Sequence, residues 1–150
     1  MTAAKKKPSV RRSYKPGDFD LKVKRSSAGM GLYVGETAIP KGVCVVEYTG
    51  HMLEGEEWQG VNSKYLFEVN ARKTIDGSPR WNLARYINHS CRPNCEPEIY
   101  KGRVFIFAKR AIKPGEELAY NYGSTYFDDF IKPYGCRCVK CAPPAARTAK

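Results

Sequence analysis

The sequence has little histidine, no long apolar run and none of the common catalytic signatures. Histidine occurs only at positions 51 and 89, so chemistry built on a Ser-His-acid relay is not expected. A Walker phosphate-binding sequence, a nucleophile elbow and a paired-histidine metal motif are absent. No apolar run approaches the ~20 residues that cross a bilayer, and no signal-peptide core follows the N-terminus. We therefore expect a soluble protein without a membrane partner, made in a reducing compartment.

Acidic residues are missing from both ends of the chain. The formal net charge is +11, yet residues 17–142 hold 18 basic and 15 acidic residues. The remaining basic residues lie in 1–16 and 143–150, which contain no acid. We predict that these two segments are disordered basic tails. Such tails either make weak, salt-sensitive contacts with nucleic acid or remain solvated extensions.

Short apolar runs separated by Pro and Gly turns predict one mainly β domain in this 150-residue chain. The run at 43–48 is typical of a buried strand, and 98–108 is typical of a hairpin with a Lys-Gly turn. Residues 52–59 are expected to form one exposed helical stretch. Gly29 and Gly31 flank Met30, which indicates either a tight turn or a close approach of backbone to a ligand.

The stretch R-Y-I-N-H-S-C-R-P-N-C at 85–95 concentrates polar side chains that need partners when buried. It contains His89, two asparagines and two of the six cysteines. Pro93 stops any helix that enters from the N-terminal side. Two interpretations stay open on composition alone: a partly buried functional turn, or an Asn-capped turn with incidental thiols.

Three cysteines lie within six residues in C-R-C-V-K-C at 136–141. Zinc takes four ligands tetrahedrally and accepts thiolates, so this cluster predicts a zinc site that lacks one local ligand. Cys91 and Cys95 are the candidates for that position, with His89 behind them. The alternative is a set of free thiols in a mobile tail.

Tyrosine is abundant, with ten in the chain. Tyr65, Tyr120 and Tyr122 lie on expected strands beside the glycine pair or the polar stretch. Phenol rings attract an ammonium group, and their hydroxyls can hydrogen-bond a neutral amine. These tyrosines therefore either line a narrow channel for a cation or act as half-buried packing residues.

Taken in order, these pieces resemble the SET-domain protein lysine methyltransferases. The matching runs are G-M-G-L-Y at 29–33, E-Y-T-G at 47–50, Y-L-F at 65–67, I-D at 75–76, N-L-A-R-Y-I-N-H-S-C-R-P-N-C at 82–95 and G-E-E-L-A-Y-N-Y-G at 115–123. The resemblance implies a β-clip of several small sheets with short helices and a C-terminal pseudoknot. It places a SET domain at 17–130 and a post-SET-like zinc segment at 131–142. The cysteine spacing departs from the family, whose second gap usually has four residues.

The resemblance also implies an activity and a set of site residues. Such enzymes transfer a methyl group from S-adenosylmethionine to the ε-amine of a protein lysine, here a histone or histone-like basic protein. The implied catalytic residues are Tyr122, Tyr120 and Tyr65. The implied cofactor-binding residues are Gly29, Met30, Gly31, Tyr33, Arg85, Tyr86, Asn88, His89 and Tyr122. The implied zinc ligands are Cys91, Cys136, Cys138 and Cys141, which makes Cys95 the runner-up.

Several finer expectations follow from the resemblance. A tyrosine at position 120, where relatives carry Phe or Tyr, predicts mainly monomethylation, and the basic tails are conceivable automethylation sites. Trp81 replaces a glycine usual in the family, so it is expected to fill part of a groove. The location is cytoplasmic for a bacterial protein and nuclear or chromatin-associated for a eukaryotic one. The competing interpretation is a zinc-stapled binding module with a degraded active site.

Overall fold

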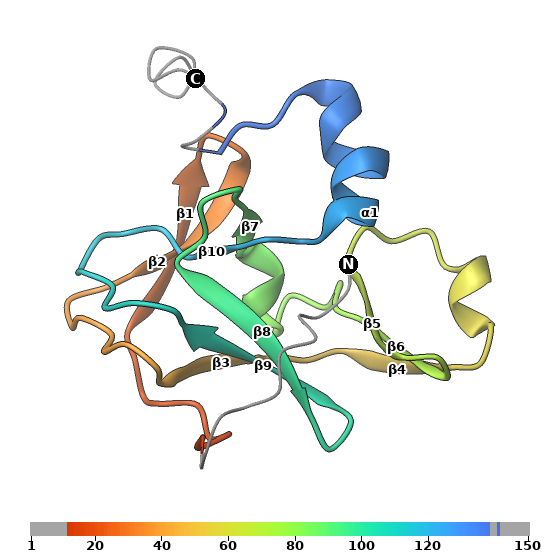
Figure 1. The fold of residues 1–150 in the computed structure, drawn as a ribbon, viewed down its shortest axis with the longest axis horizontal. Helices are drawn as coiled ribbons and strands as arrows, with labels where there is room; N and C mark the ends of the chain where they lie inside the picture. Colours follow the sequence, from red (N-terminus) through yellow and green to blue (C-terminus); the bar gives the residue numbers. More distant parts are fainter. Residues whose placement is uncertain (1–11, 139–140, 142–150) are drawn as a thin grey trace.

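The computed structural model describes residues 12–138 and residue 141. In this part of the chain, the strands form four small sheets (Figure 1). The antiparallel sheets are β1–β2 (Leu21–Ser26, Gly29–Val34), β3–β9–β8 (Cys44–Tyr48, Arg103–Ala108, Cys95–Tyr100) and β4–β6–β5 (His51–Glu54, Lys73–Asp76, Leu66–Asn70). The fourth sheet is the parallel pair β7–β10 (Asn88–His89, Ala119–Tyr120). The mainly β class and the division into several small sheets are confirmed.

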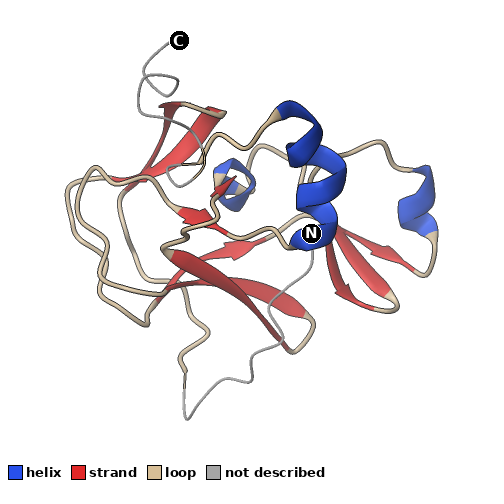
Figure 2. Ribbon diagram, turned by 45° about the horizontal axis from the view of Figure 1, so that its top comes forward, coloured by secondary structure: helices blue, strands red, loops and turns tan. Residues whose placement is uncertain are grey.

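Between residues 12 and 138, helix occurs only in short segments (Figure 2). They are η1 (Glu57–Gly60), η2 (Leu83–Tyr86), α1 (Ser124–Tyr126), η3 (Phe127–Ile131) and η4 (Lys132–Tyr134). The last three follow one another directly after β10 and form the main helical arm of Figure 2. Within the described residues, no helix has the length and apolar character needed to cross a bilayer.

Strand β9 forms the centre of the hydrophobic core. Its alternate side chains Val104, Ile106 and Ala108 are fully buried in the main apolar cluster. Phe105 and Phe107 face the other side, where the ring of Tyr14 meets both edge-on. Alternation with a period of two therefore lets one strand serve two apolar layers.

Arg12 and Tyr14, which precede β1, pack against the β3–β9–β8 sheet. Arg12 forms an ion pair with Glu98, whose residue exposure is only 2%, and Tyr14 donates a 3.0 Å hydrogen bond to the same carboxylate. The Tyr14 ring also stacks on Tyr100 at 4.0 Å between centroids. The tail boundary predicted at residue 16 does not match these contacts, because Arg12 and Tyr14 have fixed partners. The rest of the N-terminal tail, residues 1–11, and the tail at 143–150 lie outside the described residues.

The polar stretch forms a crossing with the segment that precedes Tyr122. Ala119 pairs with Asn88, and the Ser90 amide donates to the Tyr120 carbonyl at 3.1 Å. The Asn94 side chain accepts from the Ala119 amide at 2.9 Å and donates to the Glu117 carbonyl at 2.8 Å. The buried polar groups of this turn are thus satisfied by residues 117–120. This parallel pair places the segment just before Tyr122, residues 119–120, beside Asn88 and His89.

Two local predictions differ from the structure. Residues 52–59 do not form one helix: Met52 lies in β4 and the helical turn η1 begins only at Glu57, since backbone pairing with β6 outweighs a weak helical preference. Gly29 and Gly31 are not a turn but the start of β2, and the turn itself lies at residues 27–28. Gly29 has a φ of +108°, which an L side chain rarely adopts.

Candidate active site

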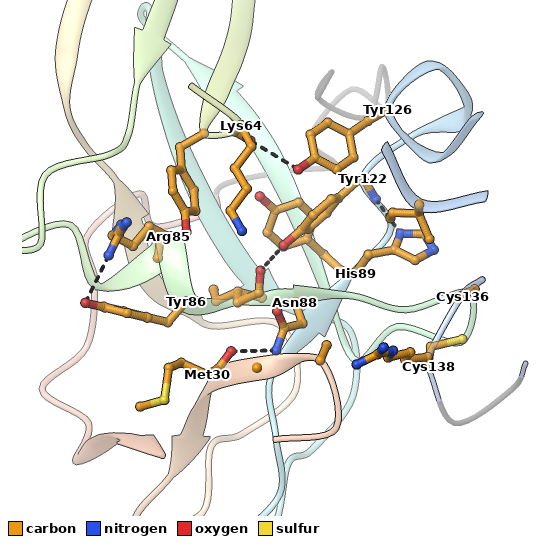
Figure 3. Close-up of a pocket in the computed structure, with 18 of the residues that line it drawn as sticks. Met30, Lys64, Arg85, Tyr86, Asn88, His89, Tyr122, Tyr126, Cys136 and Cys138 are labelled. Carbon is orange, nitrogen blue, oxygen red and sulfur yellow. Dashed lines mark hydrogen bonds between the residues drawn. The ribbon is translucent and has the colours of Figure 1, made fainter. Parts of the chain in front are cut away.

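A cavity of about 840 Å³ opens between the small sheets and the C-terminal segment that contains α1, η3 and η4 (Figure 3). Its walls combine strand β2, the residues just before β5, η2 with the turn after it, and the segment from β10 to the cysteines. The lining residues used below are Met30, Tyr48, Lys64, Tyr65, Arg85, Tyr86, Asn88, His89, Tyr120, Tyr122, Tyr126, Cys136 and Cys138.

Asn88 joins the floor of the cavity to strand β2. Its side-chain amide donates to the Met30 carbonyl at 2.9 Å, to Glu117 Oε2 at 2.8 Å and to Ser26 Oγ at 3.1 Å. A Cβ on Gly31 would overlap the same Glu117 carboxylate. A side chain at position 31 would therefore displace the carboxylate that accepts from Asn88.

Tyr122 is held at both ends. Its backbone amide donates to His89 Nδ1 at 3.1 Å, and its hydroxyl donates a short hydrogen bond to the Ile87 carbonyl (Figure 3). Burial raises the pKa of Tyr122 well above its usual range, with further contributions from neighbouring tyrosines. The phenol therefore stays neutral and is a positioning and hydrogen-bonding group, since it carries no phenolate to act as a base. Burial also lowers the pKa of His89.

Aromatic rings pack against the Tyr122 ring. The rings of Tyr120 and Tyr126 lie 5.0 and 4.9 Å from the Tyr122 ring between centroids. Tyr120 is 1% exposed, and the Tyr48 hydroxyl donates to the Tyr65 carbonyl at 2.7 Å. The three predicted tyrosines thus lie in one wall, joined by two more, Tyr48 and Tyr126. We call these five residues the tyrosine wall.

The lining also carries a guanidinium group, which lies against one member of the tyrosine wall. Arg85 lies 4.3 Å over the Tyr65 ring and 4.9 Å over the Tyr86 ring, and it donates to the Tyr86 hydroxyl at 3.1 Å. Its buried Nε has no hydrogen-bond partner among the described residues. A buried N–H without a partner is costly, so an acceptor atom of a ligand is favoured there.

The lining is basic. Among the described residues that form it, none is Asp or Glu, whereas Lys64, Arg80, Arg85 and Arg137 all contribute. Such a cavity favours a ligand that carries a carboxylate or another anionic group.

Four thiols gather at the mouth of this cavity. The sulfur atoms of Cys91, Cys136, Cys138 and Cys141 all lie within 4.8 Å of one another, and those of Cys91 and Cys141 are 3.7 Å apart. Tetrahedral zinc with bonds of about 2.3 Å holds its sulfurs ~3.8 Å apart, so the geometry fits zinc. Burial raises the pKa of Cys136 to about 12, and neighbouring thiols add to the shift. Four thiolates therefore require a cation to coexist here.

Cys95, the other candidate for the fourth position, lies elsewhere. It is 1% exposed in strand β8 and packs in the main core. Burial raises the pKa of its thiol to about 12. The alternation of β8 directs Cys95 inward, whereas Cys91 lies in the turn that faces the C-terminal segment.

Two predicted site residues are not brought to the cavity. Gly31 and Tyr33 lie outside its lining; the Tyr33 hydroxyl instead donates to the Arg25 carbonyl at 3.2 Å and approaches Glu117. Trp81 was expected to fill a groove, but it is 63% exposed and its ring meets His51 edge-on at 6.1 Å between centroids. Among the lining residues, Lys64 was missed altogether, although it precedes Tyr65 directly.

Comparison with known proteins gives the class of this domain. The SET domain family model matches residues 29–123. The chain belongs to the SET domain family. A crystal structure of KRYPTONITE in complex with mCHH DNA, an H3(1-15) peptide and SAH is similar, with a TM-score of 0.64 and 35% identity over 76% of this chain and 25% of that one.

Three relatives with similar sequences are histone-lysine N-methyltransferases much longer than this chain. Set-2 of Caenorhabditis elegans is 36% identical over 123 residues, covering 73% of this chain and 8% of set-2. ASHH1 of Arabidopsis thaliana is 35% identical over 133 residues, covering 80% of this chain and 27% of ASHH1. An H3 lysine-4 specific enzyme of Mycosarcoma maydis is 40% identical over 121 residues, 72% of this chain and 8% of that enzyme. The chain thus spans about a quarter or less of the relatives it matches.

Proposed function

We propose that this domain is an S-adenosylmethionine-dependent protein-lysine N-methyltransferase. The observation that carries the proposal is the cavity in which Asn88 and the β2 backbone meet the tyrosine wall. A cofactor with a charged end and an amine-bearing substrate both fit such a lining. The SAH-bound relative and the histone-lysine methyltransferases named above support it.

The cofactor would lie against β2 and the turn after η2. The Met30 carbonyl and the Asn88 amide face this part, and the Arg85 Nε offers an unused donor to a carboxylate. Gly29 leaves space because nothing lies within 4 Å of a Cβ added there. His89 and Tyr86 complete this side of the lining. Bound S-adenosylmethionine would supply the electrophilic methyl group.

The lysine would enter along the tyrosine wall. Its amine attacks only in the neutral form, and an ordinary lysine pKa lies near ~10.4. Desolvation inside the cavity and the neighbouring basic side chains disfavour the ammonium form, so the proton is lost to water. Tyr122, Tyr120 and Tyr65 would then align the amine, and alignment supplies much of the rate.

Zinc would be held by Cys91, Cys136, Cys138 and Cys141. Cys136 and Cys138 also line the cavity, so the metal would fix one of its walls. The ion is structural in this proposal and takes no part in methyl transfer. The division into a SET domain at 17–130 and a zinc segment at 131–142 rests on this role.

The proposed substrate is a lysine in a histone or histone-like basic protein. The relatives and the bound H3 peptide of KRYPTONITE support this class. A chromatin-associated location follows from such a substrate in a eukaryotic cell, and a cytoplasmic one in a bacterium.

The test combines binding with transfer. Isothermal titration of the zinc-loaded protein with S-adenosylmethionine should show one site, and labelled methyl groups should appear on a lysine of an H3-derived peptide. Absence of both would contradict the proposal and favour a zinc-stapled binding module. Binding without transfer to any protein of a whole-cell lysate would also contradict it.

We further propose that monomethyl-lysine is the main product. Tyr120 lies fully buried beside Tyr122, where its bulk and polarity restrict the space around an amine. Mass spectrometry of products from a Tyr120→Phe variant should show more dimethyl- and trimethyl-lysine, and Tyr100→Phe serves as the control. An unchanged product distribution in Tyr120→Phe would refute this assignment.

A further inference from the structure

Lys64 extends into the cavity from the side of the tyrosine wall. Figure 3 shows its side chain pointing from the backbone beside Tyr126 toward Tyr122. Its Nζ lies 5.5 Å from the centroid of the Tyr65 ring. This chain therefore places one of its own amines among the aromatic rings at which the proposed activity requires a lysine.

The backbone around Lys64 is fixed on both sides. The Lys64 carbonyl accepts a 3.2 Å hydrogen bond from the Tyr126 hydroxyl. The Tyr65 amide donates to Ser63 Oγ at 3.0 Å, and Ser63 donates to Asp76 at 3.0 Å. The Tyr65 carbonyl accepts from the Tyr48 hydroxyl. Hydrogen bonds from two residues of the tyrosine wall thus fix the backbone position of Lys64.

The Lys64 amine has no acidic partner in the described part of the chain. Across residues 12–138 and 141, Lys64 forms no ion pair. The described lining holds no carboxylate and several cationic side chains. A neutral amine is the nucleophile in methyl transfer, and no carboxylate in the described lining holds the Lys64 amine in an ion pair.

We propose that Lys64 is an automethylation site, modified in cis inside the cavity; this rests on the proposed methyltransferase function. The Lys64 nitrogen lone pair forms a bond to the methyl carbon of an S-methyl sulfonium donor, and the carbon–sulfur bond breaks. The electron pair of that bond stays on sulfur, so the sulfonium becomes a neutral thioether. The proton that the ammonium lost beforehand goes to water, so atoms and charge balance.

Lys24 provides a matched comparison within the same chain. Its Nζ also lies over a tyrosine ring, 4.6 Å from the centroid of Tyr33. Lys24, however, does not belong to the described lining of the cavity. Both lysines contact a phenol ring, but only Lys64 lines the cavity. A comparison of methylation at the two positions therefore distinguishes the effect of aromatic contact from the effect of access to the cavity.

The experiment uses the full, zinc-loaded chain incubated with S-adenosylmethionine labelled in its methyl group. Peptide mapping by mass spectrometry should find the label on Lys64 and none on Lys24. The first-order rate constant should not change with protein concentration, as a reaction in cis requires. Saturating H3-derived peptide should suppress the labelling, because both amines need the same place.

Variants, together with methyl transfer to the H3 peptide, distinguish failure of the Lys64 proposal from failure of the proposed methyltransferase function. The label should persist at Lys64 in Lys24→Arg and be lost from Lys64→Arg and Tyr122→Phe. Transfer to the H3 peptide with Lys64 unmodified would overturn this inference and leave the proposed function intact. A rate that rises with protein concentration would assign the labelling to a second copy and overturn the reaction in cis. Loss of both cofactor binding and peptide labelling would remove both proposals.

Discussion

The tyrosine wall and the cysteine cluster adjoin the same turn, yet different forces hold them. Tyr122 and Tyr120 are fixed by backbone pairing, ring contacts and the hydrogen bond to the Ile87 carbonyl. The four thiols have one another as neighbours, and burial together with those neighbours raises the pKa of Cys91 to about 11. Folding alone organises the first region. The second is complete only with a cation that turns thiols into thiolates.

One part of the site should therefore depend on bound metal, and the other part only on the packing of the folded chain. Loss of metal should disturb the wall formed by Cys136 and Cys138, whereas the tyrosine wall should survive it. Changes in the tyrosine wall should in turn leave zinc content unaltered. Four predictions, ordered by expected size, test this separation.

The largest effect is expected from Cys138→Ser. Cys138 is 8% exposed, and its sulfur accepts from the Cys91 amide at 3.4 Å, so its loss removes a ligand and a buried partner. Zinc content should fall to a small fraction, and the free energy of unfolding should drop by several kcal/mol, roughly a third of the zinc-binding free energy of small domains. Metal analysis and urea unfolding measure both.

The control for this variant is Cys95→Ser, which alters a buried thiol outside the cluster. It should keep full zinc content while losing about 1–3 kcal/mol of stability, because a hydroxyl is buried in an apolar setting. Equal zinc loss in the two variants would show that Cys95 takes part in the metal site.

The second effect is expected from Tyr122→Phe. The change deletes the hydroxyl that contacts Ile87 and faces the cavity. Methyl transfer to an H3-derived peptide should slow on the order of 100-fold, comparable with the loss of one aligned hydrogen-bond donor. Zinc content should be unaltered. Tyr100→Phe is the control, and equal rates in the two variants would contradict the role of Tyr122.

The third effect is expected from Gly77→Ala, which presses on the tyrosine wall from behind. A Cβ at Gly77 would lie 2.5 Å from the Tyr48 ring, so the ring must move or the chain must shift. We expect a loss of about 1–3 kcal/mol in the free energy of unfolding, typical of overpacking. Gly60→Ala is the control, since nothing lies within 4 Å of its added Cβ. Equal stability of both variants would show that the wall adapts freely.

The smallest effect is an acid dependence at the ion pair of Arg110 and Glu116. Its 2.9 Å contact holds the pKa of Glu116 below the usual 4.5, chiefly through the hydrogen bond from Arg110. A lowered folded-state pKa stabilises above pH ~4.5, and this contribution is lost as the pH falls through the folded value. Because the pair is partly exposed, the loss should stay below ~1 kcal/mol.

Urea unfolding of wild type and Glu116→Gln at pH 7 and pH 4 measures this contribution. The variant should lose slightly less stability on acidification, while zinc release should be the same in both proteins. A difference in zinc release would mean that the ion pair supports the cysteine cluster.

The sequence predicted strands better than it predicted the exposed helix. The run at 43–48 contains the observed β3, and the hairpin at 98–108 contains β9 and the second half of β8, because apolar alternation follows from burial on a β strand. The helix expected at 52–59 was wrong, since pairing of Met52 with Ile75 across β6 involves residues distant in sequence. Local preference contains no information about such pairing.

The candidate site shows the same division. The run at 85–95 and the tyrosines marked the right region by their residue types, and the structure adds that Tyr33 is turned toward Glu117 and away from the cavity. Lys64 escaped notice because a lone lysine in a loop is most often solvated, and its place in the lining depends on Tyr126, a residue far away in the sequence that donates to its carbonyl.

The sequence by itself determined the family, the mainly β class and the residue types of the site. Those properties follow from local patterns: alternation, turn residues, and the order of the motifs along the chain. The residues alone left Cys91 and Cys95 as candidates, and the family resemblance favoured Cys91. The tertiary structure places Cys91 in the cluster and Cys95 in the core, and it alone shows that Lys64 lines the same cavity as Tyr122. Each of these outcomes depends on contacts between residues far apart in the chain, which form only when the small sheets pack against one another.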